Sequence, residues 1–379
     1  MPWKAVSAML LRLEFVRLAM TERANIRSLC RRYQISPKTG YKWIDRYREA
    51  GAEALEDRSR RPHHSPRQTS ATVEQVIFRL REKHPAWGAR KLRQRLMVQG
   101  HRALPCVSTM SAILRRHGCI DPLESKKHHV CQRFEAKEPN LLWQMDFKGD
   151  FPIMHGRCYP LTVLDDHSRF SLGLDACSNQ RRETVQEHLI TTFHRYGLPQ
   201  RILTDNGGPW GSCGNDGYTD LAVWLIRLGI GLSHSRVCHP QTLGKDERFH
   251  RTLLTEVIAT QFFPSLDHCQ RSFDRWRTVY NFERPHEALA LAVPANRYQP
   301  SPREYPETLP GIEYGSTDIV RKVQGKGEIS FRGKEFKLGT AFRGYHIALR
   351  PTTTDGLYDV FFCHEHIAHI NLNNDIHQP

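Results

Sequence analysis

The stretch Leu141-Leu142-Trp143-Gln144-Met145-Asp146-Phe147 is where the hydrophobic pattern of this chain changes from a helical period to that of strands. The first strand is predicted at about 142–149. The elements predicted after it are strand 158–165, strand 169–176, helix 182–196, strand 201–204, helix 218–228, strand 231–235, helix 244–263 and helix 266–281. Three antiparallel strands followed by alternating helices and strands predict a mixed α/β sheet.

Three acidic residues, Asp146, Asp205 and Glu247, are candidate metal ligands because of where they lie in these predicted strands and helices. Asp146 is in the first strand, and its neighbours point to the opposite face of the sheet. Asp205 ends a short strand, where Asn206-Gly207-Gly208-Pro209 stops the strand and leaves room for a phosphate. Glu247 is in the first turn of the helix predicted from 244. Carboxylate oxygens suit Mg²⁺ or Mn²⁺, so the three residues predict a site for two such ions that transfers phosphoryl groups.

Other acidic residues offer alternatives to this set. Asp165-Asp166 ends the second long strand, but with His167-Ser168-Arg169 it forms a good hairpin turn, which favours a structural role. Asp246 precedes Glu247, and adjacent residues on a helix diverge by about 100°. Both cannot point into one site, so Asp246 is expected to face solvent.

The N-terminal third has the rhythm of a helix-turn-helix. The stretch 25–35 is followed by a helix predicted at 37–50, with Ser36 as its N-cap and Pro37 in its first turn. Such a helix fits a major groove, and the residues expected to contact DNA from it are Lys38, Thr39, Lys42 and Arg46. A plain helical hairpin is the alternative, because recognition helices have no unique sequence code.

A basic, proline-broken run follows, which could either track DNA or serve as an ordinary linker. Its candidate DNA contacts are Arg58, Arg60 and Arg61. Three further helices are predicted at 73–84, 88–99 and 108–117, and they form a second candidate DNA-binding domain with Arg90 and Lys91 at a helix start.

The charge distribution supports this division. The formal net charge is +15, and residues 1–140 hold 29 Lys and Arg against 13 Asp and Glu, whereas residues 141–379 hold 26 against 27. A basic region attached to a nearly neutral one indicates a nucleic-acid anchor, although a merely solubilising charge is the simpler alternative.

The last part of the chain, from about residue 305, shows no helical period in its apolar residues. Short alternating runs from about 318 to 370 are separated by Gly, Asp-Gly or Asn turns, and predict a small β-barrel of about five strands. The sequence does not decide what this domain binds: the DNA backbone, another protomer and the catalytic domain are all candidates.

The ten cysteines are scattered and form no pair at two-residue spacing, so no zinc knuckle or disulfide framework is expected. His128, His129 and Cys131 cluster, but the rest of a four-ligand set is missing nearby. The chain shows no secretory leader and no stretch of about 20 apolar residues, which predicts a cytoplasmic protein that is nucleoid-associated when bound to DNA.

Several motifs together resemble one known group. They are Trp143-Gln144-Met145-Asp146-Phe147, Leu161-Thr162-Val163-Leu164-Asp165-Asp166-His167-Ser168-Arg169, Thr204-Asp205-Asn206-Gly207, the stretch from His239 to Leu253, and Tyr280-Asn281 with Arg284-Pro285-His286. In these motifs the chain resembles the bacterial insertion-sequence D-D-E transposases, whose ribonuclease-H-like core is similar to that of retroviral integrases. There are two departures: the 41 residues between Asp205 and Glu247 exceed the spacing typical of retroviral integrases, and Leu243 replaces a small polar residue.

The resemblance implies that Asp146, Asp205 and Glu247 are the catalytic metal ligands, with two Mg²⁺ or Mn²⁺ ions per active site. It implies binding to the element's terminal inverted repeats and to target DNA, strand cleavage and strand transfer, and at least a dimer in the synaptic complex. Lys245 and Arg248, beside Glu247, are candidate phosphate contacts. A non-catalytic DNA-binding protein, either a repressor or a domesticated transposase, is the rival interpretation.

The expected fold is therefore multidomain α/β, with tandem helix-turn-helix N-terminal domains, a ribonuclease-H-like mixed-sheet core and a small C-terminal β-barrel. The expected boundaries are a helix-turn-helix domain at 1–56, a basic linker at 57–72, a second helical domain at 73–120, a connector at 121–137, the catalytic core at 138–300 and the barrel at 305–379.

Overall fold

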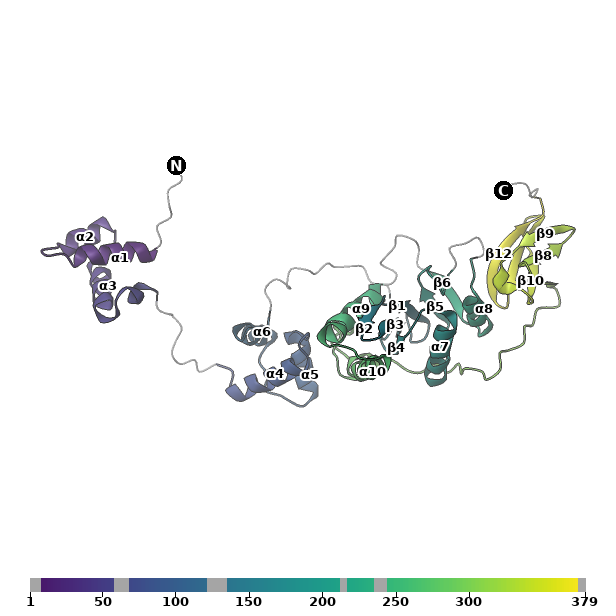
Figure 1. The fold of residues 1–379 in the computed structure, drawn as a ribbon, viewed down its shortest axis with the longest axis horizontal. Helices are drawn as coiled ribbons and strands as arrows, with labels where there is room; N and C mark the ends of the chain where they lie inside the picture. The colour runs from purple at the N-terminus through teal and green to yellow at the C-terminus, as the bar shows by residue number, and fades with distance from the viewer. Residues whose placement is uncertain (1–7, 58–67, 121–134, 212–216, 235–243, 374–379) are drawn as a thin grey trace. The chain divides into compact units, whose positions relative to one another are not determined.

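A computed structural model describes residues 8–57, 68–120, 135–211, 217–234 and 244–373 of the chain. The described residues divide into two compact units, which meet in the sequence between Gln68 and Thr69 (Figure 1). Each unit has hydrophobic clusters of its own. Within the described residues, no helix combines the length and the apolar character needed to cross a bilayer.

The N-terminal unit consists of α1 (Ala8–Ala19), α2 (Ile26–Arg32) and α3 (Pro37–Ala50), followed by a short 3₁₀ turn. The Ser36 hydroxyl accepts a hydrogen bond from the Thr39 amide at 3.2 Å, and Pro37 opens the helix. The predicted start of the helix is thus confirmed, because local capping chemistry alone specifies it. The helices pack around a small core that includes Phe15, Cys30 and Trp43.

Gly40 lies where α3 packs closely against Cys30 and Phe15. A Cβ at this position would lie 2.5 Å from Cys30 Sγ and 3.0 Å from Phe15 Cζ, so α3 can pack against α1 and α2 only because Gly40 has no side chain. We expect Gly40→Val to lower the free energy of unfolding of this unit by about 1–3 kcal/mol through overpacking, measured by urea denaturation. Lys38→Ala, an exposed change on the same helix, should leave it within about 0.5 kcal/mol.

The second unit begins with α4 (Ala71–Lys83), α5 (Ala89–Val98) and α6 (Val107–Arg116). Their buried side chains form one cluster with Trp87, which lies between α4 and α5, and Val279 from a later helix packs against it. Arg95 pairs with Glu283 at 2.8 Å. This helical group therefore rests on the domain that follows.

The central sheet has the strand order β2-β3-β1-β5-β6, with β4 paired to β3. Its strands are β1 (Leu142–Phe147), β2 (Phe151–Ile153), β3 (Gly156–Asp165), β4 (Ser171–Cys177), β5 (Arg201–Thr204) and β6 (Gly231–His234). β1 is antiparallel to β3 and parallel to β5, which is in turn parallel to β6. The mixed sheet is confirmed; β2 was not anticipated, because a three-residue strand containing Pro152 has no readable period.

Helices cover both faces of this sheet (Figure 1). On one face, α7 (Arg182–Tyr196) and α8 (Asp220–Arg227) bury Trp143 and Met145 of β1. On the other, α9 (Gly244–Glu256) and α10 (Leu266–Phe282) pack Phe249 and Phe273 against β3 and β4. Since side chains alternate along a strand, Asp146 must lie on the α9 face.

One pair ties α7 to β4. His188 Nδ1 lies 3.4 Å from Asp175 Oδ1, and hydrogen bonding to Asp175 and then to Cys177 raises the pKa of His188 to about 10. A histidine whose pKa is raised on folding contributes stability that is fully present below its unfolded value of about 6.5 and is lost as the pH rises toward 10.

We therefore expect the stability difference between the wild type and His188→Gln to be largest near pH 6 and to shrink steadily up to pH 10. Urea midpoints measured at each pH would give this difference. His155→Gln, at an exposed turn position, serves as the control and should show no such trend. A difference that grows with pH would contradict the pairing.

The C-terminal domain corrects the expected barrel. It contains a four-stranded sheet, β12-β11-β10-β7, and a separate hairpin, β8-β9. The strands are β7 (Ile319–Lys322), β8 (Glu328–Phe331), β9 (Lys334–Lys337), β10 (His346–Pro351), β11 (Leu357–Phe362) and β12 (Glu365–Asn371). β10 is already paired on both edges, with β7 and β11, so the hairpin pairs only with itself. Within the described residues the edge strands β7 and β12 do not pair with each other, and the sheet stays open. Alternation in the sequence predicts strands, but not whether a sheet closes.

Candidate active site

Asp146 lies on β1, facing α9. Burial raises its pKa to about 7, and the negative charges of Asp205 and Glu247 act in the same direction, while a backbone hydrogen bond from Phe147 opposes them. Three acidic side chains from separate elements are thus near enough to repel one another. A buried carboxylate close to other negative charges is stabilised by binding either a proton or a cation.

Asp205 follows β5 directly. β1 and β5 pair in parallel with Gln144 opposite Leu203, so the same register, continued for two residues, puts Asp146 beside Asp205. The Gly207 amide donates to Asp205 Oδ1 at 3.1 Å, and a Cβ on Gly207 would lie 3.0 Å from Asp205 Oδ2. The glycine after the strand therefore allows the carboxylate to fold back onto the chain.

Glu247 lies in the first turn of α9, and its side chain is exposed. The described residues contain one group of three donor side chains within 4.8 Å of one another, and it lies in the C-terminal domain. The set Asp146, Asp205 and Glu247 is more widely spaced than that. Its donor chemistry, three hard oxygen ligands that repel one another, fits divalent cations such as Mg²⁺ or Mn²⁺.

His250, one turn after Glu247, is a neighbour that was not predicted to act at the site. Its Nε2 lies 2.8 Å from Thr162 Oγ1, and its Nδ1 lies 4.0 Å from Asp146 Oδ2. Burial, and then the charge of Lys148, lowers the pKa of His250 to about 4. The neutral ring fixes α9 against β3 beside Asp146. The i+3 spacing from Glu247 was the available signal.

The expectation for Asp246 was wrong. Its side chain is fully buried, neither carboxylate oxygen has a hydrogen-bond partner among the described residues, and burial followed by the charge of Asp146 raises its pKa well above the usual range. Asp246 lies three residues before Phe249 and seven before Leu253, both of which are buried on the inner face of α9. This spacing places Asp246 inside and Glu247 outside.

Asp165 and Asp166 stabilise the turn that follows β3. Asp165 Oδ1 accepts from the Ser168 amide at 2.7 Å, and Asp165 Oδ2 accepts from the Asn140 amide at 2.7 Å. Asp166 accepts from Gln144 Nε2 at 2.7 Å and pairs with Lys245. These contacts support the structural role expected for the two residues.

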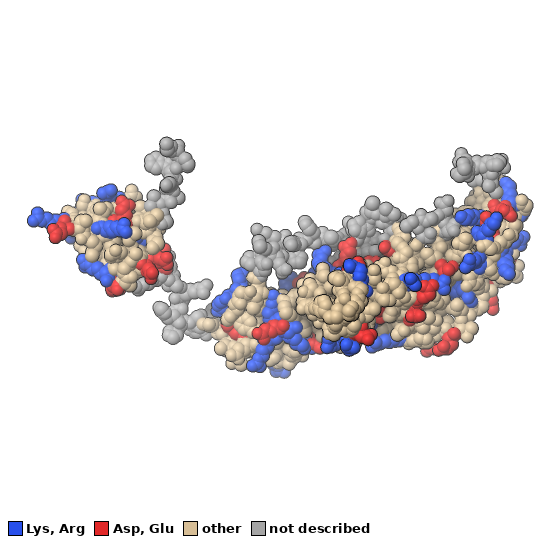
Figure 2. Space-filling model, viewed as in Figure 1, with Lys and Arg blue, Asp and Glu red and all other residues tan. Residues whose placement is uncertain are grey.

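The candidate DNA contacts fall in different environments. Lys38 and Lys42 are exposed on α3, whereas Thr39 and Arg46 are half-buried; Lys42 and Arg46 stack on Trp43 at 4.5 and 5.0 Å. Arg58, Arg60 and Arg61 lie outside the described residues. In Figure 2, Lys and Arg side chains are interspersed with Asp and Glu over the visible face.

In the second unit, Arg90 is exposed and Lys91 is half-buried. Arg90 lies 3.9 Å from Glu287, and burial, followed by the charge of Arg284, lowers the pKa of Lys91 to about 8. Lys245 is 10% exposed and donates to the Asp166 carbonyl at 2.9 Å. Arg248 is exposed beside Glu247.

Family models match successive parts of the chain. A helix-turn-helix domain matches residues 11–63, and a homeodomain-like domain matches 39–114. Two integrase core domain models match 136–240 and 228–294, and the C-terminal domain of the IS481 family transposases matches 318–377.

Curated relatives include insertion-element proteins. The IS407 uncharacterized 31.7 kDa protein of Burkholderia multivorans is 26% identical over 157 residues, which is 41% of this chain and 54% of that protein. The putative transposase of IS5376 from Geobacillus stearothermophilus is 25% identical over 268 residues, 67% of this chain and 64% of that protein. The chain thus spans between half and two thirds of the length of these relatives.

Among solved structures, the HTLV-2 integrase catalytic core domain in complex with magnesium is similar at 15% identity and a TM-score of 0.34, over 44% of this chain and all of that one. The matched domains support an insertion-sequence transposase with an integrase-like core and helix-turn-helix domains. More particularly, its C-terminal domain is of the type found in the IS481 family.

Proposed function

We propose that this protein binds the terminal inverted repeats of an insertion sequence and catalyses strand cleavage and strand transfer with Asp146, Asp205 and Glu247. The observation that carries the proposal is the shared electrostatics of these residues: Asp146, half-buried in the sheet, has its pKa raised to about 7, in part by Asp205 and Glu247. Three carboxylates at one place, with cations nearby on α9, suit a reaction on a polyanion.

Asp146, Asp205 and Glu247 would hold two Mg²⁺ or Mn²⁺ ions, which would activate the attacking oxygen and stabilise the leaving oxygen of an in-line phosphodiester displacement. The chain's own residues keep this arrangement in place. The neutral His250 fixes α9 to β3, and the Lys245–Asp166 pair anchors the start of α9 to the turn after β3. The side chain of Arg248 is exposed, and Arg248 is our candidate for a phosphate contact.

The recognition surface is proposed to lie on α3, where Lys38 and Lys42 are exposed and Thr39 and Arg46 are half-buried. Arg58, Arg60 and Arg61 are proposed to follow the DNA backbone. Arg90 and Lys91 are proposed as further DNA contacts, with Arg90 exposed and Lys91 half-buried. Because cleavage and joining act on two element ends, the working form is proposed to be at least a dimer.

The test is a cleavage and joining assay. Purified protein is incubated with a labelled terminal fragment of the element that encodes it, a plasmid target, and either Mg²⁺ or Mn²⁺. We expect metal-dependent nicked and joined products from the wild type and none from Glu247→Gln. Binding without products under both metals would favour the rival function, a DNA-binding protein without catalytic activity.

Binding should depend steeply on salt, because each neutralised phosphate contributes about 0.9 to the log-log slope. We expect Lys42→Ala in the full chain to weaken binding to all DNA sequences and to reduce the slope by about 1 if it contacts a phosphate. Arg195→Ala, an exposed change on α7, is the control and should leave the slope unchanged. Fluorescence anisotropy over a salt series measures both quantities, and a flat salt response would contradict the basic anchor.

A further inference from the structure

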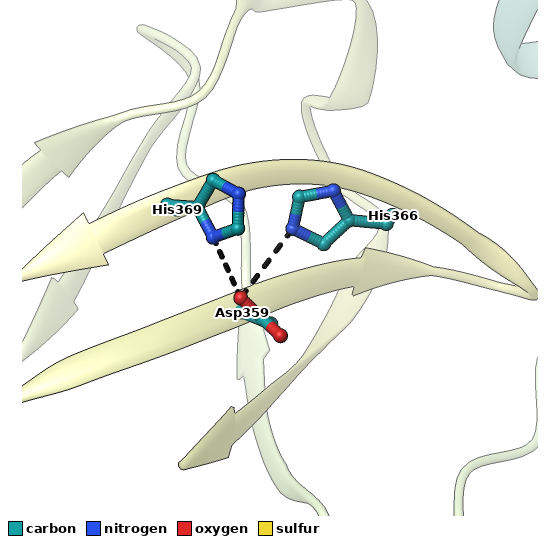
Figure 3. A group of neighbouring side chains, drawn as sticks. All are labelled: Asp359, His366 and His369. Carbon is teal, nitrogen blue, oxygen red and sulfur yellow. Dashed lines mark hydrogen bonds and ion pairs between the residues drawn. The ribbon is translucent and has the colours of Figure 1, made fainter. Parts of the chain in front are cut away.

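A group of three side chains on the C-terminal sheet lies outside the core discussed above. Asp359 comes from β11, and His366 and His369 come from β12; one donor atom from each lies within 4.8 Å of the others (Figure 3). His369 Nδ1 lies 2.6 Å from Asp359 Oδ1, and His366 Nε2 lies 3.6 Å from the same oxygen. Both rings therefore point toward one carboxylate oxygen.

An irregularity in strand pairing brings the second histidine to this face. Asp359 is opposite His369 and Val360 is opposite Ala368, but Phe361 is opposite His366, so Ile367 is the extra residue of a bulge. Regular pairing would put Ile367 opposite Phe361 and turn His366 to the other face, because side chains alternate along a strand. The bulge re-aims His366 toward Asp359.

His366 has an unsatisfied nitrogen in this arrangement. Its Nε2 is enclosed and has no hydrogen-bond partner among the described residues, since 3.6 Å is too long for a hydrogen bond to Asp359. A buried polar atom without a partner is costly, and a metal ion between the three donors would satisfy it. This is a second observation, independent of the clustering, that favours a ligand.

The nearest competing cation is already engaged. Arg350 is opposite Asp359 on β10, but its guanidinium makes two hydrogen bonds to Asp318, at 2.8 and 3.0 Å. Asp359 therefore keeps its carboxylate available to the two histidines. The side chains of Asp359, His366 and His369 are 31%, 37% and 63% exposed, which leaves room for water to complete a coordination shell.

We propose that Asp359, His366 and His369 bind a divalent transition-metal ion of the zinc class, with water in the remaining positions. Two imidazoles and one carboxylate suit Zn²⁺, Ni²⁺ or Cu²⁺ far better than Mg²⁺, which prefers oxygen donors. The ion would clip β11 to β12 at the free edge of the open sheet. This site is separate from the three core carboxylates and does not depend on their role.

The test uses the full chain, free of affinity tags and stripped with a chelator, titrated with Zn²⁺ by calorimetry in excess Mg²⁺. We expect His369→Ala and His366→Ala each to lose one binding event or weaken it by at least about 10-fold. Asp359→Asn keeps the shape of the side chain and removes its charge, and it should weaken the same event. His364→Ala, on the same hairpin but outside the group, is the matched control and should bind as the wild type does.

The outcomes separate clearly. A binding event that is absent or clearly weaker in all three cluster variants and unchanged in the control supports the site. A wild type that takes up no Zn²⁺, or Zn²⁺ binding that is equal in the wild type and in Asp359→Asn, overturns it. Since Asp359→Asn is nearly isosteric, this comparison stands even if removal of an imidazole disturbs the hairpin.

Discussion

Asp146→Asn is expected to abolish strand cleavage and strand transfer while leaving binding to the element ends intact. The change keeps the shape of the side chain and removes the negative charge at the point where the effects of Asp205 and Glu247 converge. If the carboxylate contributes about 4 kcal/mol of charge stabilisation through the metal ions, the rate should fall roughly 10³-fold or more. The rate of product formation on a labelled DNA end measures it.

The control for this variant is Asp165→Asn. Asp165 is an acidic residue at the end of β3; it is fully buried, and its oxygens accept hydrogen bonds from Ser168 and Asn140. We expect its main effect to be on stability, with the catalytic rate of the folded fraction preserved. If Asp146→Asn lost DNA binding to the same extent as activity, the separation between recognition on α3 and chemistry in the core would be refuted.

Arg284→Met is expected to cost the core about 3–5 kcal/mol of unfolding free energy, the largest stability effect we anticipate. Arg284 Nε lies 3.0 Å from Glu256 Oε1, and each side chain is only 9% exposed. The other oxygen of Glu256 accepts from Trp276 Nε1 at 2.9 Å. Removal of the guanidinium would leave a carboxylate buried with a single hydrogen bond, and breaking such a pair from one side is costly.

The unfolding free energy is measured by urea denaturation followed by tryptophan fluorescence. Two further variants serve as comparisons. The double variant Glu256→Leu, Arg284→Met should be more stable than Arg284→Met alone, because neither charge is then stranded. Arg182→Met breaks an exposed pair with Asp220, with side chains 43% and 50% exposed, and should cost less than about 1 kcal/mol. A loss below 1 kcal/mol for Arg284→Met as well would show that the buried pair is not specially stabilising.

Much of the fold could be predicted from the sequence because the signals are local. The start of α3 at Pro37 follows from Ser36 and its capping hydrogen bond, and α7 begins and ends at the residues expected. The strands of the core follow from short apolar runs bounded by turn residues, since a central strand covered by helices on both sides is buried on both faces. These features depend on a few neighbouring residues, so the amino-acid order is sufficient to read them.

The expectations that proved wrong concern features that depend on contacts between distant parts of the chain. Asp246 is buried and Glu247 exposed because Phe249 and Leu253 orient α9, and only packing against β3 and β4 determines which face is inner. Lys245 lies against Asp166, which is 79 residues away in sequence. The C-terminal sheet stays open within the described residues, because its edge strands β7 and β12 do not pair and the β8-β9 hairpin forms a sheet of its own.

The sequence by itself determined the mixed sheet, the capped helix α3 and the choice of Asp146, Asp205 and Glu247 as candidates, since residue types and local periods carry that information. The tertiary structure alone decided which carboxylates share one electrostatic environment, that His250 fixes α9 beside Asp146, and that a bulge at Ile367 brings His366 and His369 to one carboxylate. The reason is physical: proximity across strands and helices is set by register and packing, which a linear pattern does not encode.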